Sequence, residues 1–149
     1  MDRQAIDRTV GRLSDLCAGL GPLQIMEICG THTVSLFRSG VKSLMPRSLR
    51  LVSGPGCPVC VTSQGYIDAA CDLADRDDVT ICTYGDMVRV PGRSGSLEHR
   101  RGRGARVVVV YSARDALQYA KAHPQTNVVF LAVGFETTTP PTAATLIEA

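Results

Sequence analysis

Short apolar runs that alternate with helical stretches constrain the fold of this chain more than any other feature. The five runs that have the length of strands are residues 23–28, 49–53, 79–83, 107–111 and 127–133. Helical stretches separate them at residues 33–45, 63–74 and 113–122, and residues 2–19 have the apolar spacing of an amphipathic helix. Such alternation predicts a parallel sheet with right-handed crossovers. We therefore expect an α/β fold: a Rossmann-like parallel sheet of about five strands, flanked by helices and preceded by an N-terminal helix.

The domain organisation follows from length and composition. With 149 residues, of which 44% are hydrophobic and 20% charged, the chain can form the core of one domain. We expect a helical segment at residues 1–22 and a Rossmann-like domain at 23–149, with a loop rich in Gly and Arg at 85–106. The segment 137–142 carries Thr and Pro residues that suit a helix start, but no stop signal follows. The domain is therefore expected to be truncated within its last helix.

Charge and cysteine usage restrict the compartment and the partners. A net charge of +2 gives no support to nucleic-acid or membrane-surface binding by the molecule as a whole. The N-terminus lacks the features of a signal peptide, and no apolar run is long enough for a transmembrane helix. Six cysteines without an export signal indicate a reducing compartment, so we expect a cytoplasmic protein that binds neither nucleic acid nor membranes.

Two cysteines lie in a turn rich in Gly and Pro, GPGCPVC at residues 54–60. At the spacing of Cys57 and Cys60, two thiols can form a disulfide or bind one metal ion. The start of a following helix would stabilise a thiolate there. Gly and Pro residues favour a rigid turn, which suits a functional site. The alternative is a pair of small buried residues beside a turn.

A third cysteine opens the segment CGTH at residues 29–32, directly after the first apolar run. Together with Cys57 and Cys60, Cys29 and His32 could complete a structural zinc site with four ligands. Structural zinc pairs usually lie in small units rich in loops, whereas these residues follow strands, so an open site is the preferred interpretation. The remaining cysteines have apolar neighbours and are expected to be buried: Cys17, Cys71 and Cys82.

Polar residues also follow the other predicted strands. In one parallel sheet all strand exits lie along the same edge, where ligands bind in open α/β folds. Asp86 and Arg89 follow the third strand, and Glu136 follows the fifth. Taken alone, Glu136 is interpreted as an acid that complements a helix dipole. Arginines at 100–106 are interpreted as a solvated basic loop, because no aromatic residues are interleaved for RNA binding.

Four segments together resemble the HypD family of hydrogenase maturation factors. The segments are MEICGTHT at 26–33, GPGCPVC at 54–60, YGDMVRVPG at 84–92 and GFETTTP at 134–140. They occur in the family's order, and the resemblance runs through the chain from about Leu23 onward. It implies a scaffold on which the iron centre of nickel-iron hydrogenase, carrying cyanide and carbon monoxide ligands, is assembled before delivery.

The resemblance also implies partners and residue roles. HypC would be the direct partner and HypE the cyanide donor. Cys29 would be the iron ligand, shared with a cysteine of HypC, and Cys57 with Cys60 would be the redox-active dithiol. His32 and Glu136 would line the same cleft and orient ligands or move protons. Thiolates suit low-spin iron, and a neighbouring dithiol can pass electrons by cycling with its disulfide.

The chain differs from this family in length. Members of the family have a second α/β half and C-terminal cysteines that hold a four-iron, four-sulfur cluster, and this chain stops before both. We therefore expect no such cluster in this chain. Two other functions stay open on the residues alone: a structural zinc-binding interaction module, and a stand-alone thiol-disulfide oxidoreductase.

Overall fold

The fold was analysed in a computed structural model that describes residues 2–149. Parallel strands flanked by helices confirm the predicted α/β class, and an N-terminal helix precedes them. The chain divides into two compact units, residues 1–60 and residues 61–149. The five predicted strands are all present, but they form two sheets, one of two strands and one of three. Hydrophobic periodicity identifies a strand without specifying its neighbours, which is why the sequence suggested one sheet.

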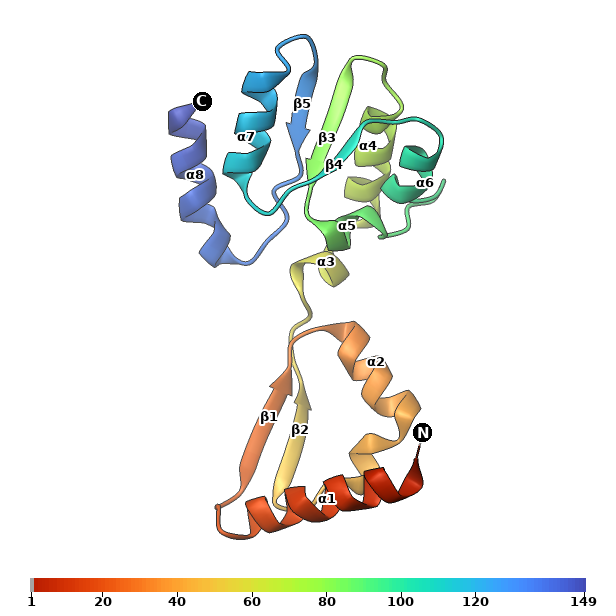
Figure 1. The fold of residues 1–149 in the computed structure, drawn as a ribbon, viewed down its shortest axis with the longest axis vertical. Helices are drawn as coiled ribbons and strands as arrows, with labels where there is room; N and C mark the ends of the chain where they lie inside the picture. Colours follow the sequence, from red (N-terminus) through yellow and green to blue (C-terminus); the bar gives the residue numbers. More distant parts are fainter. Residues whose placement is uncertain (1) are drawn as a thin grey trace. The chain divides into compact units, whose positions relative to one another are not determined.

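The first unit is a pair of parallel strands with helices beside it. Its elements are α1 (Arg3–Ala18), β1 (Leu23–Glu27), α2 (Gly30–Ser39), the 3-10 helix η1 (Val41–Leu44) and β2 (Leu49–Ser53). Asp2 caps α1 by accepting a hydrogen bond from the backbone N–H of Gln4. The strands pair in register from Leu23 opposite Leu49 to Glu27 opposite Ser53. Figure 1 shows α2 returning alongside this strand pair, so both strands point toward the end at which α2 begins.

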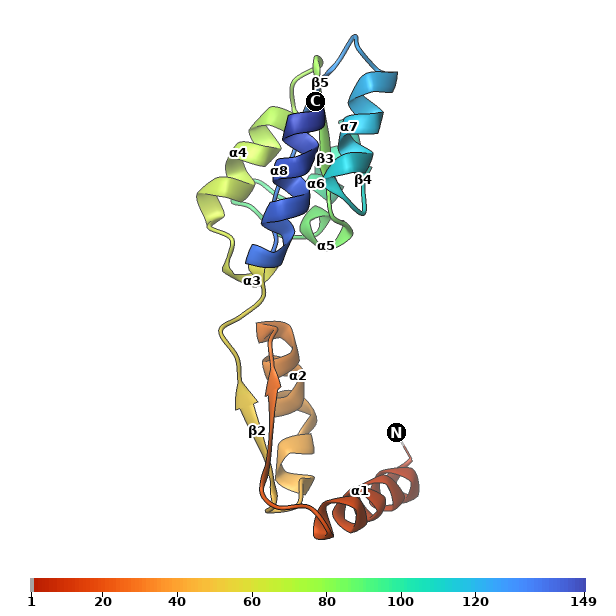
Figure 2. The ribbon, with the colours of Figure 1, turned by 90° about the vertical axis from the view of Figure 1, so that its left-hand side faces the viewer.

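The second unit has a three-stranded parallel sheet in the order β4-β3-β5. Its elements are α4 (Gln64–Ala74), β3 (Val79–Thr83), α5 (Gly85–Val88), α6 (Leu97–Gly102), β4 (Val107–Val109), α7 (Ala113–Ala122), β5 (Asn127–Phe130), the 3-10 helix η2 (Glu136–Thr138) and α8 (Thr139–Glu148). The short helix α3 (Pro58–Val61) lies at the boundary of the two units. Figures 1 and 2 show α4 and α6 on one face of this sheet and α7 on the other, with α8 packed against α7.

The core of the second unit is centred on β3, in which all five residues are buried. Ile81 of β3 is fully buried, and Ile67 of α4 and Met87 of α5 are buried as well. Cys71 and Cys82 belong to this core, and Cys17 is buried in the first unit. The prediction that these three cysteines are packing residues is therefore confirmed.

Two local predictions were wrong in detail. The segment 85–106, expected to be a loop, contains α5 and α6. Leu97 is the only large apolar residue of α6, so no helical periodicity marks it, and its start depends on the Ser96 hydroxyl, which accepts from the His99 backbone N–H. The helix expected over 33–45 ends at Gly40 and continues as η1. Across residues 2–149, none of the helices combines the length and hydrophobicity that crossing a membrane requires.

Candidate thiol and metal centre

The exits of β1 and β2 bring three cysteines of the first unit together. Because the strands are parallel, the segment that contains Cys29 and the turn that leads to Cys57 leave the same end of the pair. The turn begins at Gly54, whose backbone N–H donates to the Glu27 carbonyl at 2.8 Å. A Cβ atom at Gly54 would lie 2.7 Å from that carbonyl oxygen, so only glycine fits. Gly56 continues the turn with a φ of 94°, a conformation that glycine adopts without strain.

The sulfur atoms of Cys29, Cys57 and Cys60 form a compact triangle. The Sγ–Sγ distances are 3.2 Å between Cys57 and Cys60, 3.4 Å between Cys29 and Cys60, and 3.6 Å between Cys57 and Cys29. Cys29 immediately precedes α2, while α3 places Cys57 and Cys60 one turn apart. The structure thus brings together the three thiols that the sequence singled out, although they lie up to 31 positions apart in the chain.

The thiols of this triangle differ in acidity. The pKa of Cys29 is lowered to about 6, first by the backbone N–H of Thr31 and then by hydrogen bonds from Cys60, the Thr31 hydroxyl and Cys57. The pKa of Cys57 is raised, first by its hydrogen bond with Cys60, and its sulfur lies within hydrogen-bond distance of both neighbouring sulfurs. At neutral pH Cys29 is therefore mostly a thiolate, whereas the Cys57 thiol stays protonated.

This arrangement suits a soft metal ion. The three sulfurs all lie within 4.8 Å of one another. A first-row metal ion lies about 2.3 Å from each thiolate, which places two thiolates at a tetrahedral angle about 3.8 Å apart. The observed separations are close to that value, so one ion can bind all three sulfurs after a small expansion of the triangle. Cys60 is exposed, which leaves the cluster open to solvent and to further ligands.

His32 lies on the exposed side of the first turn of α2. Within the described residues, the group of side chains close enough to share a metal ion contains the three cysteines, and His32 is not a member of it. A closed zinc site with His32 as the fourth ligand is therefore not formed. The open site favoured from the sequence agrees better with this geometry.

The other predicted site residues belong to the second unit. Asp86 is exposed in α5, and Glu136 is exposed as the first residue of η2. They follow β3 and β5, which are parallel neighbours, so both leave the same edge of their own sheet. Arg89 pairs with Glu98 at 3.7 Å, and both side chains are exposed. This ion pair connects the end of α5 to α6.

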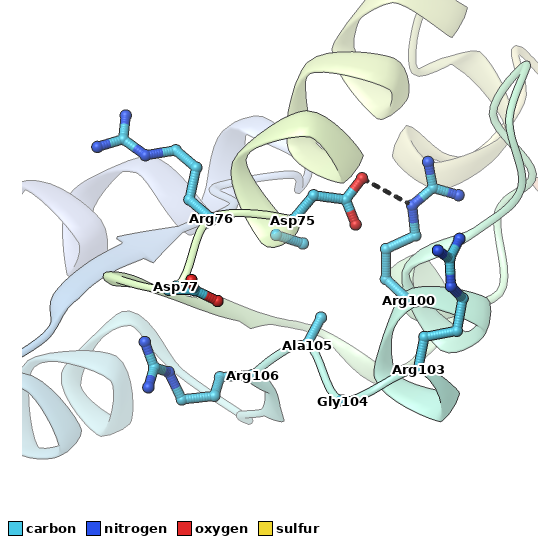
Figure 3. A pocket seen from close by; sticks show the side chains of 9 residues that line it. Asp75, Arg76, Asp77, Arg100, Arg103, Gly104, Ala105 and Arg106 are labelled. Carbon is cyan, nitrogen blue, oxygen red and sulfur yellow. Dashed lines mark hydrogen bonds and ion pairs between the residues drawn. The ribbon is translucent and has the colours of Figure 1, made fainter.

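A basic pocket of about 220 Å³ lies at the opposite, amino end of β3 and β4. Figure 3 shows that its arginines do not converge: Arg76 and Arg106 point away from Arg100 and Arg103. Arg100 is buried and is held by Asp75 at 3.4 Å and by Ser94. Arg76 is paired with Asp78. The prediction of a solvated basic loop is thus wrong for Arg100, which is buried in α6 and serves a structural contact, whereas Arg101, Arg103 and Arg106 are exposed.

Sequence reasoning missed the polar contacts beside the thiols. Glu27, the last residue of β1, accepts hydrogen bonds through Oε1 from the Ser53 hydroxyl at 3.0 Å and the Thr33 hydroxyl at 3.2 Å. Its pKa is lowered, first by its own backbone N–H and then by these two hydroxyls. Its second oxygen, Oε2, is shielded from solvent and has no hydrogen-bond partner among the described residues. A charged residue at the end of an apolar strand was the signal that could have identified it.

Fold and site together define the class of protein: a parallel α/β protein that presents three clustered thiols where two strands end. The family described as "HypD: Hydrogenase formation hypA family" matches residues 4–149. The chain belongs to this HypD family, as the resemblance implied.

Individual relatives support the same conclusion. The chain is 49% identical to hydrogenase maturation factor HypD of Escherichia coli (strain K12) over 128 residues, which are 86% of this chain and 34% of that protein. It is 54% identical over 125 residues to the HypD of Cupriavidus necator, covering 83% of this chain and 33% of that protein. The HypD of Rhodobacter capsulatus is 44% identical over 142 residues, covering 94% and 38%. The chain thus spans about a third of the length of these curated relatives.

Proposed function

We propose that this chain acts in hydrogenase maturation as part of the scaffold on which the Fe(CN)2CO centre of nickel-iron hydrogenase is assembled. Iron is the cargo in this proposal, and it leaves with its cyanide and carbon monoxide ligands when assembly is complete. The observation that carries the proposal is the triangle of Cys29, Cys57 and Cys60, with sulfur separations of 3.2 to 3.6 Å. Membership of the HypD family supplies the link to hydrogenase maturation.

Cys29 is the proposed iron ligand. Its pKa of about 6 makes it a thiolate at neutral pH, and a thiolate is the form that binds a metal ion. Strong-field ligands such as cyanide and carbon monoxide give low-spin iron, for which a soft sulfur donor is well suited. In the proposed complex a cysteine of HypC shares the iron with Cys29, and HypE supplies cyanide.

Cys57 and Cys60 are proposed to be the redox arm of the site. Their sulfurs are the closest pair, at 3.2 Å, because Cys57 immediately precedes α3 and Cys60 lies within it. When the two thiols form a disulfide, they release two electrons and two protons, which an iron-bound species or a partner protein can accept. His32 and Glu136 are proposed to orient ligands or move protons, and the compartment is proposed to be the cytoplasm.

Infrared spectroscopy of the chain purified with HypC tests the proposal. We expect absorption bands of iron-bound cyanide and carbon monoxide in the complex, and their loss in Cys29→Ala. Cys17→Ala is the matched control, because Cys17 is buried away from the cluster and its loss should leave the bands in place. Bands that persist in Cys29→Ala would refute the assignment of the iron ligand.

A stand-alone thiol-disulfide oxidoreductase is the second candidate, favoured by the 3.2 Å separation of Cys57 and Cys60. It predicts turnover on a disulfide substrate that requires these two cysteines and is indifferent to Cys29. Such turnover in Cys29→Ala, without any infrared bands in the unchanged chain, would favour this candidate over iron assembly.

A further inference from the structure

Glu27 connects three elements beside the thiol cluster without touching the metal-binding sulfurs. Its side chain accepts hydrogen bonds from Ser53 at the end of β2 and from Thr33 in the first turn of α2. Its carbonyl accepts the Gly54 backbone N–H, directly across the same strand pair. One residue at the end of β1 thus holds the end of β2 and the start of α2.

The positions of these contacts relate them to the cysteines. Cys29 follows Glu27 by two residues and lies immediately before α2, so a contact from Glu27 to Thr33 restrains the direction in which Cys29 leaves the strand. Thr33 is further tied to Cys29 by its backbone N–H, which donates to the Cys29 carbonyl at 3.2 Å. The Ser53 contact restrains the turn that leads to Cys57. Both restraints bear on the distance between Cys29 and the other two thiols.

The pair of Cys57 and Cys60 depends on local structure instead. These two residues lie on one turn at α3, and the Cys60 backbone N–H donates to the Cys57 sulfur at 3.4 Å. Their separation requires no contact from β1. The cluster therefore consists of a locally formed pair and a third thiol, Cys29, which is placed from a different strand.

We propose that Glu27 is a positioning residue that, through Ser53 and Thr33, holds Cys29 against the Cys57–Cys60 pair. This inference rests on the proposed function only in one respect, which is that the cluster of three thiols is taken as the functional site. It also accounts for a carboxylate at a position where its second oxygen, Oε2, is shielded from solvent. The carboxylate is retained at this position for the two hydroxyl contacts that its other oxygen makes.

Rates of disulfide formation separate positioning from general stability. Oxidised glutathione can link Cys29 to Cys60 in the full chain that carries Cys57→Ser. In the full chain that carries Cys29→Ser, it can link Cys57 to Cys60. In each case two thiols lose two electrons and two protons, and one molecule of oxidised glutathione becomes two of reduced glutathione. Acid quenching and peptide mass spectrometry give both rates, in the presence and absence of a substitution at Glu27.

We expect Glu27→Ala to slow the Cys29–Cys60 reaction by at least about tenfold, because small displacements of reacting groups reduce their effective concentration strongly. The Cys57–Cys60 rate in the same variant should stay within about twofold, as expected for sites that do not share contacts. In Glu27→Gln both rates should stay within about threefold of those measured without a substitution at Glu27. The reason is that an amide oxygen can accept hydrogen bonds from the same two hydroxyls. Ser53→Ala and Thr33→Val should each slow the Cys29–Cys60 reaction less than Glu27→Ala.

Asp15→Asn, on α1 of the same unit, is the matched control and should change neither rate. Unchanged Cys29–Cys60 rates in Glu27→Ala would overturn the inference, and so would equal slowing of both reactions, which would indicate a general loss of structure. Slowing by Glu27→Gln as large as that by Glu27→Ala would also overturn it, because the hydrogen bonds would then not be the cause. The assay needs no iron, so the inference and the proposed function can fail independently.

Discussion

The two compact units are both built from parallel strands and helices, yet they bury their strands to different extents. In the second unit β3 has strand neighbours on both sides, and all five of its residues are buried. In the first unit β1 pairs only with β2 among the described strands, and none of its residues is fully buried. A central strand covered on both faces contributes stability, whereas the ends of a half-covered pair keep side chains accessible for chemistry.

The cysteines follow the same division. Cys71 and Cys82 are packed in the core of the second unit, and burial raises the pKa of both thiols. Cys29, Cys57 and Cys60 lie where the strands of the first unit end, and Cys60 is exposed. The same residue type is therefore a packing group in one place and part of a more accessible thiol cluster in another, according to what surrounds it.

The largest expected effect is a difference between the two sheets in how much stability is lost when an isoleucine is replaced by alanine. Ile81 of β3 is 0% exposed and Ile25 of β1 is 53% exposed. Ile81→Ala should lower the free energy of unfolding by about 2–5 kcal/mol, because it leaves a cavity in a close-packed core. Ile25→Ala, the matched control, should cost less than about 1 kcal/mol. Urea titration followed by circular dichroism measures both, since the chain has no Trp to report by fluorescence. Equal costs would break the comparison between the sheets.

Alkylation of the native protein tests the division between the cysteines. With iodoacetamide at pH 7, we expect Cys71 and Cys82 to react at least about 100-fold more slowly than Cys29, because a buried thiol reacts only when the structure opens. Peptide mass spectrometry over a time course gives the rate for each cysteine. In urea the rates should converge. Rapid labelling of Cys82 in the native protein would contradict the packing described for β3.

The lowered pKa of Cys29 predicts how the reactivity of this thiol in the first unit depends on pH. Its pKa is lowered to about 6, so the thiolate predominates above pH 6 and is lost as the pH falls below it. The alkylation rate of Cys29 should rise about tenfold between pH 5 and pH 7 and then level off, because the thiolate is the nucleophile. The Cys60→Ser variant should have its midpoint at higher pH if the thiol of Cys60 assists as described. A midpoint near pH 8.5 in the unchanged chain, the ordinary value for a cysteine, would refute the assignment.

The smallest expected effect concerns an exposed contact in the second unit. Arg89 and Glu98 pair at 3.7 Å with side chains that are 80% and 60% exposed. Glu98→Gln should change the free energy of unfolding by less than about 1 kcal/mol, because solvent screens such pairs. The urea titration used for Ile81→Ala measures it under the same conditions. A larger loss would mean that this loop contributes to the core in a way that its exposure does not suggest.

The strand positions were largely predictable because each strand is a short apolar run bounded by polar or Gly residues. The limits of β2 and β3 agree with those predicted, and β1 and β5 are shorter by one to three residues at their ends. The pairing of the strands was not predictable, since an apolar run carries no information about its neighbour. The helix α6 was missed because its start is determined by a Ser96 hydroxyl contact and not by periodicity.

The residues of the candidate site also fall into those that the sequence could predict and those that it could not. Its cysteines could be predicted, because two cysteines separated by two residues in a turn of Gly and Pro are an uncommon local pattern with few chemical uses. The role of Glu27 could not, because its partners Ser53 and Thr33 come from different elements and meet it only in the folded chain. His32 was a candidate fourth ligand by spacing alone, but in the described residues it is not one of the side chains close enough to share a metal ion with the thiols.

By itself the sequence determined the α/β class, the approximate limits of the strands, the thiols capable of chemistry and the family, since all of these depend on local patterns of residue type. Tertiary structure alone decided that the strands form two sheets and that Cys29 meets Cys57 and Cys60. Hydrogen bonds from Cys60 and Cys57, which folding brings close, also lower the pKa of Cys29, in addition to the local contacts from Thr31. The physical reason is that strand pairing and the distances between the thiols arise from contacts between residues remote in the chain, and such contacts exist only after folding.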